Sequence, residues 1–356
     1  MTSTKNVLIW DYALDGLVFE DKANGIAVQF YFWSLTFIEH GWGVYSLSTK
    51  KRPNKQKISF IKLGKSKFDF FIEWIKVVYV IRRTNSNLII VRGADRKTFP
   101  VALVSKLLKV KFVFFAASDV NFVPGKELIH GVGLNKKLYQ KSIRLIPYIV
   151  VQNTYQKQTL LNNYGKNCLM MPNIWRGETN NTTTEKHIDV IWIANFRRLK
   201  RAEWMVNIAR KNKKIRFVLV GRPSAEKEYY NEIEHDCSEL DNVTFYGPLG
   251  LDETNALVAR SRILACTSEF EGFPNTFLQA WANSIPVVST VDPSNVIEQN
   301  NLGIIVNNED EFNISIQNLL ADRDVYENKC NCIKKYFKAK HSSDANFSKL
   351  MTYIQE

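Results

Sequence analysis

The chain alternates short, β-rich apolar runs with longer helix-like runs, and it does so in two successive series. Strands are expected at 7–10, 44–48, 88–91, 111–115, 149–152 and 169–172, and again at 189–194, 216–221, 243–245, 263–266 and 286–289. Helical patterns lie between them, among others at 26–39, 68–83, 99–108, 202–211 and 229–239. Such alternation favours parallel strands joined by crossover helices, so the predicted class is α/β.

A polar run divides the two series. Residues 176–186 contain two asparagines and three consecutive threonines, as is typical of a linker. A chain of 356 residues also exceeds what one hydrophobic core comfortably holds. We therefore expect an N-terminal domain over 1–173, a linker over 174–187 and a C-terminal domain over 188–341.

The composition is that of a globular protein from a reducing compartment. Apolar residues make up 45% of the chain and charged residues 23%. The first residues run directly into a strand-like segment and not a signal peptide. The longest charge-free run, 23–38, is shorter than the ~20 apolar residues of a membrane-spanning helix. Because the five cysteines lack the spacing of a disulfide framework, we predict a cytoplasmic protein.

Positive charge is concentrated in the first half of the chain. Residues 1–173 carry 26 Lys and Arg against 10 Asp and Glu, a net charge of +16. Residues 174–356 carry 22 against 25, so the whole chain has a net charge of +13. This asymmetry predicts that the first half meets an anionic partner. Nucleic acid is not expected, because no recognised module or ordered aromatic–basic pattern accompanies the charge.

The segment 266–290 carries the most functional information. It reads CTSEFEGFPNTFLQAWANSIPVVST, a small acidic loop followed by a short helix to about 283 and a strand. Gly272 and Pro274 predict a rigid turn, and Asn275 or Thr276 can cap the helix. The unpaired N–H groups of a helix start favour an anion such as a diphosphate.

Two polar residues of this segment fit the recognition of a sugar. Glu271 in the loop and Gln279 in the helix are eight residues apart, so both can face the same side. A carboxylate and an amide offer the acceptors and donors that sugar hydroxyls require. The segment therefore predicts a nucleotide-sugar site.

This segment resembles the donor-site signature of glycosyltransferase family four, a group of retaining enzymes with the GT-B fold. The family pattern has a Glu, seven residues and a second Glu, within E-G-F-P-N and a later P-V-V. Glu271 matches the first acid, whereas Gln279 stands where the second is usual and Ser284 replaces a usual Gly. The match is continuous over the second half of the chain and diffuse over the first.

The resemblance implies a fold and an activity. The fold would be two Rossmann-like domains that face each other across a cleft, with a last helix, about 342–356, that often packs on the first domain. The activity would be transfer of a hexose-type sugar from a UDP- or GDP-sugar, with retained configuration and without a metal or cofactor. In the family, the first acid of the signature faces the transferred sugar and the second holds the ribose.

The resemblance also implies a phosphate-binding loop in 193–201, with Arg197 and Lys200 three residues apart. Fixed cations aimed at the leaving diphosphate stabilise the transition state more than the ground state. A solvated basic loop is the alternative explanation. The residues expected to be catalytic are Arg197, Lys200 and Glu271, and those expected to bind the donor are Gly221, Leu249, Gly272, Phe273, Pro274, Asn275, Thr276 and Gln279.

The remaining candidates have equally good structural explanations. Leu249 lies in 247–250, where the family's backbone meets the nucleobase, but a plain turn explains the residues as well. Gly25 stands in the place of the family's glycine-rich first loop, or simply begins a helix. Asp119 follows a strand and could contact acceptor or donor, although helix capping is the commoner role. His40 is interpreted as a helix terminus and not as a base.

The helical segment 68–83 permits two interpretations. Asp69, Glu73 and Lys76 would form one polar stripe on an otherwise apolar helix, with basic residues on both sides. The helix would then either pack in the core with a single solvent-facing side or lie on an anionic membrane. Each basic residue near such a membrane adds roughly 1 kcal/mol to the binding free energy. Lipid-linked sugar acceptors reside on such surfaces.

The sequence thus predicts a cytoplasmic glycosyltransferase, peripheral on the inner membrane face in the membrane interpretation. The acceptor would be a saccharide or a lipid-linked sugar in cell-surface polysaccharide assembly. Two alternatives stay open: a sugar-nucleotide epimerase or hydrolase of the same fold, and a non-catalytic partner subunit whose site has decayed.

Overall fold

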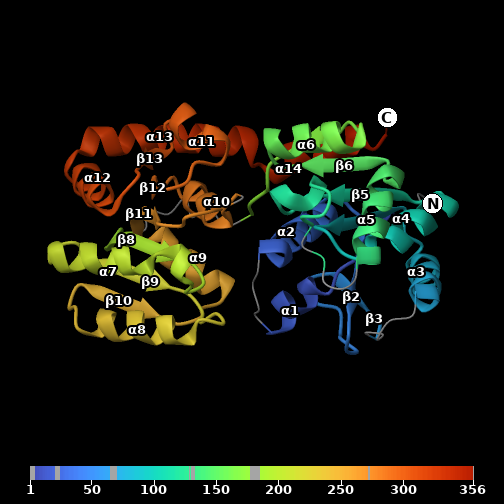
Figure 1. The fold of residues 1–356 in the computed structure, drawn as a ribbon, viewed down its shortest axis with the longest axis horizontal. Coiled ribbons are helices and arrows are strands. Elements are labelled where there is room, and N and C mark those ends of the chain that lie inside the picture. The colour runs from blue at the N-terminus through green and yellow to red at the C-terminus, as the bar shows by residue number, and fades with distance from the viewer. Residues whose placement is uncertain are drawn as a thin grey trace. The chain divides into compact units, whose positions relative to one another are not determined.

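The chain forms two compact units (Figure 1). The computed structural model describes residues 5–20, 25–64, 70–127, 129, 133–176, 185–271 and 273–355. Unit 1 comprises Met1–Ile174 together with Ser343–Glu356, and unit 2 comprises Trp175–Ser342. Each unit is built around one parallel sheet.

Unit 1 contains a seven-stranded sheet in the order β3-β2-β1-β4-β5-β6-β7. All strand pairs described in it are parallel, with Val7 opposite Val44 in one pair and opposite Leu88 in the other. The order starts in the middle and reverses, as in Rossmann-like domains. The strands are β1 (Asn6–Ile9), β2 (Gly43–Ser48), β3 (Ile58–Lys62), β4 (Leu88–Arg92), β5 (Lys111–Phe115), β6 (Tyr148–Val151) and β7 (Leu169–Met170).

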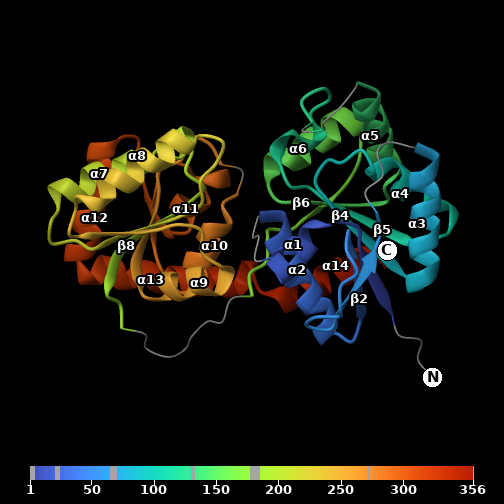
Figure 2. The ribbon, with the colours of Figure 1, turned by 90° about the horizontal axis from the view of Figure 1, so that it is seen from below.

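Helices cover both faces of this sheet (Figure 2). They are α1 (Ala13–Glu20), α2 (Gly25–Glu39), α3 (Phe70–Thr84), α4 (Thr98–Leu107), α5 (Gly133–Leu145), α6 (Thr154–Tyr164) and α14 (Ser343–Tyr353), with the 3₁₀ turn η1 (Asp119–Phe122). All five residues of β4 are buried, because a parallel strand covered on both faces has no solvent side. One core cluster joins β1, β4 and β5 to apolar residues of α3, α4 and α5.

Helix α14 brings the end of the described chain onto α2 of unit 1. Its Phe347 is 6% exposed. The ring centroid lies 5.3 Å from that of Phe37 in an edge-to-face arrangement and 3.8 Å from that of His40, on which it stacks. His40 follows α2 directly, and its Nδ1 lies 2.9 Å from the carbonyl oxygen of Thr36. The imidazole therefore helps to seat α14.

Unit 2 contains a six-stranded parallel sheet in the order β10-β9-β8-β11-β12-β13, which again starts in the middle and reverses. Helices α7 and α8 cover one face, and α10 and α13 the other (Figure 2). The strands are β8 (Ile188–Ile193), β9 (Phe217–Val220), β10 (Val243–Tyr246), β11 (Ser261–Cys266), β12 (Val287–Ser289) and β13 (Gly303–Ile305). The helices are α7 (Ala202–Lys211), α8 (Lys227–Ser238), α9 (Leu251–Ala259), α10 (Asn275–Ala282), α11 (Val296–Gln299), α12 (Glu309–Ala321) and α13 (Arg323–Lys340), with 3₁₀ turns η2 (Arg198–Lys200) and η3 (Pro293–Asn295).

Helix α3 exposes a different face from the one that the sequence predicted. The side chains of Glu73 and Lys76 form an ion pair at 3.7 Å and are only 13% and 17% exposed. Ile75 and Tyr79, by contrast, are 69% and 48% exposed. The expected polar stripe is therefore wrong, because the paired charges satisfy one another near the protein body while apolar side chains face water. Asp69 lies outside the described residues.

The apolar pattern did not reveal every element. Helices α5 and α6 are mostly polar, with only four and two buried residues, so a hydrophobic period is hard to see. Helix α13 likewise carries many charged residues, and it packs against α10 and α12. No helix among the described residues is both long enough and apolar enough to cross a membrane.

The packing of α14 leads to a first prediction. Replacing Phe347 by Ala should lower the free energy of unfolding by about 3 kcal/mol, because a buried aromatic ring is lost from the contact with α2. Urea unfolding followed by circular dichroism measures this. Lys349→Ala, an exposed change on the same helix, should stay within about 0.5 kcal/mol of wild type. Equal losses in the two variants would contradict the packing argument.

Candidate functional site

The carboxyl ends of the unit 2 strands gather the predicted donor residues at one edge of the sheet. Ligands of such sheets bind outside these ends, at the point where the strand order reverses, here between β8 and β11. The loop after β8 contains Arg197 and Lys200, and the loop after β11 contains Glu271. Gly221 follows β9 and Leu249 follows β10, so both lie at the same edge.

The two loops at the reversal point are tied together by hydrogen bonds. The backbone N–H of Glu269 donates to the carbonyl oxygen of Leu199 at 2.9 Å. The Thr267 hydroxyl donates to the carbonyl oxygen of Lys200, and Nε of Arg201 donates to the carbonyl oxygen of Thr267 at 2.7 Å. These bonds hold the basic loop against the acidic loop without involving the ammonium of Lys200.

Lys200 and Glu271, predicted as two catalytic residues, form an ion pair. Their side chains are 16% and 23% exposed, so the pair is partly shielded from water. The Ser268 hydroxyl donates to the same carboxylate oxygen at 3.0 Å. Burial raises the pKa of the neighbouring Cys266 thiol, and the negative charge of Glu271 raises it further, so this cysteine stays a neutral thiol. The charged chemistry at this edge therefore belongs to the ion pair.

The arginines of the basic loop have different surroundings. Arg198 pairs with Glu232 at 3.4 Å on the surface, and its backbone N–H donates to Glu226. The Arg201 guanidinium lies over the Trp204 ring at 4.4 Å. Arg197 is exposed, and no ion pair or side-chain hydrogen bond is found for it in the part of the chain that the structure describes. Of the three, Arg197 has the guanidinium most available to an incoming anion.

Helix α10 begins without a side-chain cap. The N-cap residue is Pro274, so Asn275 and Thr276 are already inside the first turn, and the expectation that one of them caps the helix is wrong. Proline fixes the extended backbone just before the helix and supplies no side-chain acceptor. Of the first-turn amides, that of Phe277 donates to the Pro274 carbonyl at 3.2 Å.

Gln279 is 4% exposed, and its amide Nε2 donates to Oδ1 of Asn255 at 2.6 Å. Asn255 belongs to α9, and the sequence analysis did not include it among the site residues. No spacing rule could have found it, because 24 residues separate the partners and α9 and α10 meet only in the tertiary structure. The Gln279 amide is thus oriented by a neighbouring helix, which leaves its carbonyl oxygen to accept further bonds.

The remaining residues that were predicted to bind the donor have different structural surroundings. A Cβ on Gly221 would lie 1.8 Å from the Ala194 carbonyl oxygen, so the close approach of the loops after β8 and β9 requires glycine there. Phe273 packs edge-on against Trp281 at 6.1 Å and therefore anchors its loop. Phe270, which was not predicted, is 78% exposed beside Glu271. Gly272 lies outside the described residues, and Leu249 is half-buried.

In unit 1, the structure gives Asp119 and Gly25 definite local roles. Oδ1 of Asp119 accepts hydrogen bonds of 2.9 Å from both Asn153 and Gln156. Ser118 is the N-cap of η1, so Asp119 does not cap that turn but orients Asn153, the N-cap of α6. Gly25 is the first residue of α2. Neither observation tests a contact with an acceptor.

Asp11 is a titratable group that the sequence analysis missed. It follows β1 at the reversal point of the unit 1 sheet, next to β4. The pKa of Asp11 is raised from 3.8 to about 6, mainly by burial and also by the negative charge of Asp95, while the Ala13 amide and Lys97 oppose the rise. The available signal was its position directly after an apolar strand.

Part of unit 2 matches a known protein family. Residues 187–322 match the family model described as Glycosyl transferases group 1. Glycosyltransferase 1 domain-containing protein 1 of Xenopus tropicalis is 23% identical over 174 residues, which cover 47% of this chain and 50% of that protein. The match thus spans about half the length of this curated relative.

Solved structures resemble the whole chain. A glycosyltransferase from Rickettsia africae has a TM-score of 0.73 at 15% identity, covering 99% of this chain and 98% of that one. Sucrose-phosphate synthase from Thermosynechococcus elongatus has a TM-score of 0.71 at 13% identity, covering 98% of both chains. A putative UDP-N-acetylglucosamine 2-epimerase from Listeria monocytogenes has a TM-score of 0.62 at 12% identity, covering 92% and 91%.

These findings confirm the predicted fold class. The chain has the α/β fold of GT-B glycosyltransferases, with two Rossmann-like domains, and a Glycosyl transferases group 1 domain lies in unit 2. Membership of family four and the roles of single residues stay predictions.

The raised pKa of Asp11 predicts a pH dependence of stability. The folded protein holds this proton up to about pH 6, whereas the unfolded chain releases it near 3.8. The free energy of unfolding should therefore fall as pH rises between these values, by up to about 3 kcal/mol, an upper bound because the side chain keeps some contact with water. Asp11→Asn should remove this fall in urea unfolding measured at several pH values.

The exposed Asp241→Asn, in unit 2, serves as the control and should keep the wild-type pH profile. Parallel profiles for wild type and Asp11→Asn would show that the Asp11 carboxyl titrates normally.

Proposed function

We propose that this protein is a retaining glycosyltransferase that moves a hexose-type sugar from a UDP- or GDP-sugar to an acceptor hydroxyl. The observation that carries the proposal is the Lys200–Glu271 ion pair at the reversal point of the unit 2 sheet, beside the uncapped start of α10. This pair belongs to the segment that matches the Glycosyl transferases group 1 model.

In the proposed reaction, the acceptor oxygen forms a bond to the anomeric carbon on the face from which the diphosphate leaves. The bond between that carbon and the diphosphate oxygen breaks, and the departing diphosphate takes the acceptor proton. No separate base is required, and the protein's task is to stabilise the charge on the leaving group. Lys200 and the exposed Arg197 supply fixed positive charge, and the α10 start adds the positive end of its dipole.

In the ion pair, Glu271 contacts the Lys200 ammonium that the proposed diphosphate would also bind. Without a donor, its ammonium is neutralised by Glu271. A bound diphosphate would compete for the ammonium, and the freed carboxylate could then accept hydrogen bonds from the sugar hydroxyls. Gln279, oriented by Asn255, would bond the ribose through its remaining carbonyl oxygen. Affinity for the nucleotide and positioning of the sugar are thus coupled through one contact.

For the wider context, we propose a saccharide or lipid-linked acceptor, cell-surface polysaccharide assembly and a cytoplasmic location. An epimerase or hydrolase is a second candidate, because the Listeria monocytogenes protein shows the same fold. Such an enzyme would consume the donor without any acceptor. A non-catalytic partner subunit is the third, and it would fail to bind nucleotides at all.

Substitutions of the ion pair test the proposal. Lys200→Ala and Glu271→Ala should each lower sugar transfer at least about 100-fold, because each removes charge placed at the reacting centre. Saturating UDP or GDP, but not both, should raise the midpoint of thermal unfolding by several degrees, since 100 times the dissociation constant adds about 2.7 kcal/mol. Lys200→Ala should weaken this shift, whereas Glu271→Ala should keep or enlarge it because the ammonium loses its counter-charge.

Glu269→Ala, an exposed change in the same loop, is the control and should retain transfer. Near-normal transfer in either ion-pair variant would overturn the proposed site. A midpoint that no nucleotide moves would instead favour the non-catalytic subunit, and a new sugar nucleotide formed without acceptor would favour the epimerase.

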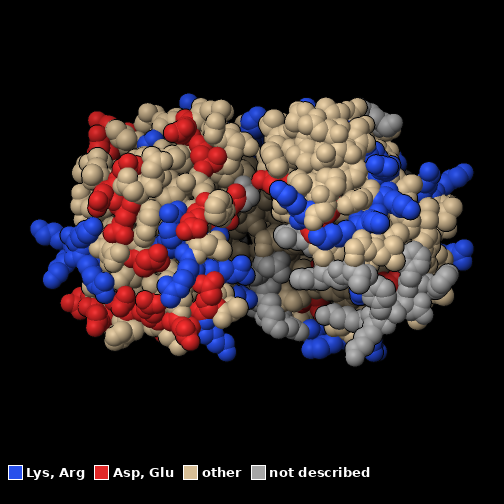
Figure 3. Space-filling view, viewed as in Figure 1, with Lys and Arg blue, Asp and Glu red and all other residues tan. Residues whose placement is uncertain are grey.

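We also propose that unit 1 docks on an anionic membrane through α3. Ile72, Ile75 and Tyr79 are 41%, 69% and 48% exposed and recur at helical spacing, so they share one face. Arg82 and Arg83 follow at the end of the same helix. On the face drawn in Figure 3, acidic side chains gather mostly over unit 2, which leaves unit 1 the more basic surface. Apolar side chains beside cations suit the interface of an anionic bilayer.

Vesicle sedimentation tests this docking. The protein should bind phosphatidylglycerol-containing vesicles at low salt, and binding should weaken as salt screens the charges. Ile75→Glu should reduce binding strongly, because it puts a charge into the apolar face. The control Ile314→Glu, at an isoleucine of unit 2 that is 54% exposed, should leave binding unchanged. No binding at low salt, or equal effects of the two variants, would refute docking through α3.

A further inference from the structure

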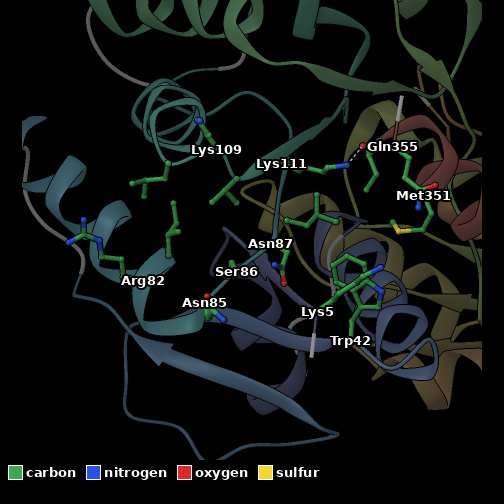
Figure 4. Close-up of a pocket in the computed structure, with 15 residues that line it drawn as sticks. Lys5, Trp42, Arg82, Asn85, Ser86, Asn87, Lys109, Lys111, Met351 and Gln355 are labelled. Carbon is green, nitrogen blue, oxygen red and sulfur yellow. Dashed lines mark hydrogen bonds between the residues drawn. The ribbon is translucent and has the colours of Figure 1, made fainter. Parts of the chain in front are cut away.

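A hollow lies at the amino-terminal edge of the unit 1 sheet, the edge opposite Asp11 and Asp119. Its volume is about 640 Å³, and it is lined where β4 and β5 begin and where α3, α4 and α14 end (Figure 4). Because the catalytic groups of parallel sheets lie at the carboxyl ends of the strands, this hollow is separate from any acceptor site on unit 1. Neither the sequence motifs nor the proposed reaction uses it.

The lining of the hollow is strongly basic. Lys5, Arg82, Lys109 and Lys111 line it, and none of the described lining residues is acidic. Asn85, Asn87 and Gln355 add side-chain amides, which can donate hydrogen bonds to an anion. Figure 4 shows these side chains coming from different segments of the chain around one space.

The negative ends of the helix dipoles balance only part of this positive charge. The carboxyl ends of α3, α4 and α14 meet here, and each carries about half a negative charge, so three ends contribute roughly −1.5. Four full positive charges outweigh them by about 2.5. Two of the four, Lys5 and Lys111, lie at strand starts and not at helix ends. The excess charge therefore favours an anionic ligand over simple compensation of the helix dipoles.

Part of the lining of the hollow is apolar. Trp42, Leu88, Val110 and Ile354 contribute to it, and the Lys5 ammonium lies 5.7 Å from the centroid of the Trp42 ring. A small inorganic anion would leave this surface unused. An anion that carries an apolar group would fill both parts of the hollow.

Two lining residues, Asn85 and Lys109, adopt the left-handed backbone conformation, which asparagine tolerates and lysine does not favour. Asn85 directly follows α3, and Lys109 lies two residues after the end of α4; their φ angles are 45° and 56°. Glycine takes this left-handed conformation at helix ends at the lowest cost. A lysine in its place puts a cation at the mouth of the hollow, and such unfavourable conformations are found disproportionately at binding sites.

Lys111 is already held in position. Its ammonium donates to the carbonyl oxygen of Ile354, at the end of α14. This bond uses one of three ammonium hydrogens and leaves two for a ligand. The contact also links the sheet edge to α14, so the wall of the hollow depends on the docked C-terminal helix.

We propose that this hollow binds a phosphate-bearing anion with an apolar part. A soluble organic phosphate and a phospholipid headgroup share that chemistry. Arg82 stands seven residues after Ile75 on the exposed face of α3, so the hollow opens beside the membrane-docking face proposed above. The phosphate-binding proposal does not rest on sugar transfer, because its residues line the amino-terminal edge of the unit 1 sheet, whereas the proposed donor residues belong to unit 2.

The test uses hexyl phosphate as the probe and the full chain carrying Arg197→Ala and Lys200→Ala, so that the donor site cannot contribute. Titration calorimetry at low salt should show binding of hexyl phosphate at least tenfold tighter than that of inorganic phosphate. Charge reversal by Lys5→Glu with Lys109→Glu should weaken it at least tenfold. The control Lys137→Glu, an exposed change on α5, should alter it less than twofold.

Both reversed lysines are exposed, and the milder pair Lys5→Gln with Lys109→Gln should weaken binding in the same direction if the reversals impair folding. Hexyl phosphate that fails to bind, or that binds equally to the charge-reversed and wild-type hollows, would overturn the proposal. Ile75→Glu should leave hexyl phosphate binding intact, which separates this site from the α3 surface.

Vesicles containing phosphatidic acid then distinguish the source of the phosphate. If the ligand is a lipid headgroup, sedimentation with these vesicles should fall in the Lys5→Glu, Lys109→Glu variant and not in Lys137→Glu. If hexyl phosphate binding depends on the two lysines but sedimentation does not, the ligand is a soluble organic phosphate.

Discussion

Parallel pairing of every described strand is the constraint on which both units depend. A parallel strand needs a crossover on one face or the other, so helices cover both sides and the strands lose their solvent face. The same geometry sends every strand's carboxyl end to one edge. The loops that follow β8, β9, β10 and β11 therefore lie at the same edge, although they are far apart in the chain.

The electrostatics of unit 2 follow from this convergence. The basic loop before α7 and the acidic loop before α10 are joined by hydrogen bonds to the backbone carbonyls of Leu199 and Lys200, which hold the two loops side by side. A partly shielded ion pair is easier to exchange than a fully buried one, because water and an incoming diphosphate can both reach the ammonium. In the proposed reaction, the diphosphate would replace the carboxylate at Lys200, and the sugar hydroxyls would then donate hydrogen bonds to Glu271.

In unit 1, the basic side chains that line the hollow lie at the amino-terminal edge of the sheet. The excess of Lys and Arg in the first half of the chain supplies the basic rim of the hollow, next to the apolar face of α3. The hydrogen bond from Lys111 to Ile354 and the stacking of Phe347 on His40 join this edge to the end of the chain. A segment that is last in sequence therefore completes a site of the first domain.

The sequence by itself determined the α/β class, most strands, the helix Ala202–Lys211 and the signature around Glu271, because these depend on local periodicity and turn chemistry. It could not supply the Gln279–Asn255 hydrogen bond, the pKa of Asp11 or the hollow beside Lys109, since each arises where distant segments meet. The exposed face of α3 was decided by tertiary structure too. Pairing of Glu73 with Lys76 near the protein body left Ile75 and Tyr79 to face water, against the pattern expected from polarity alone.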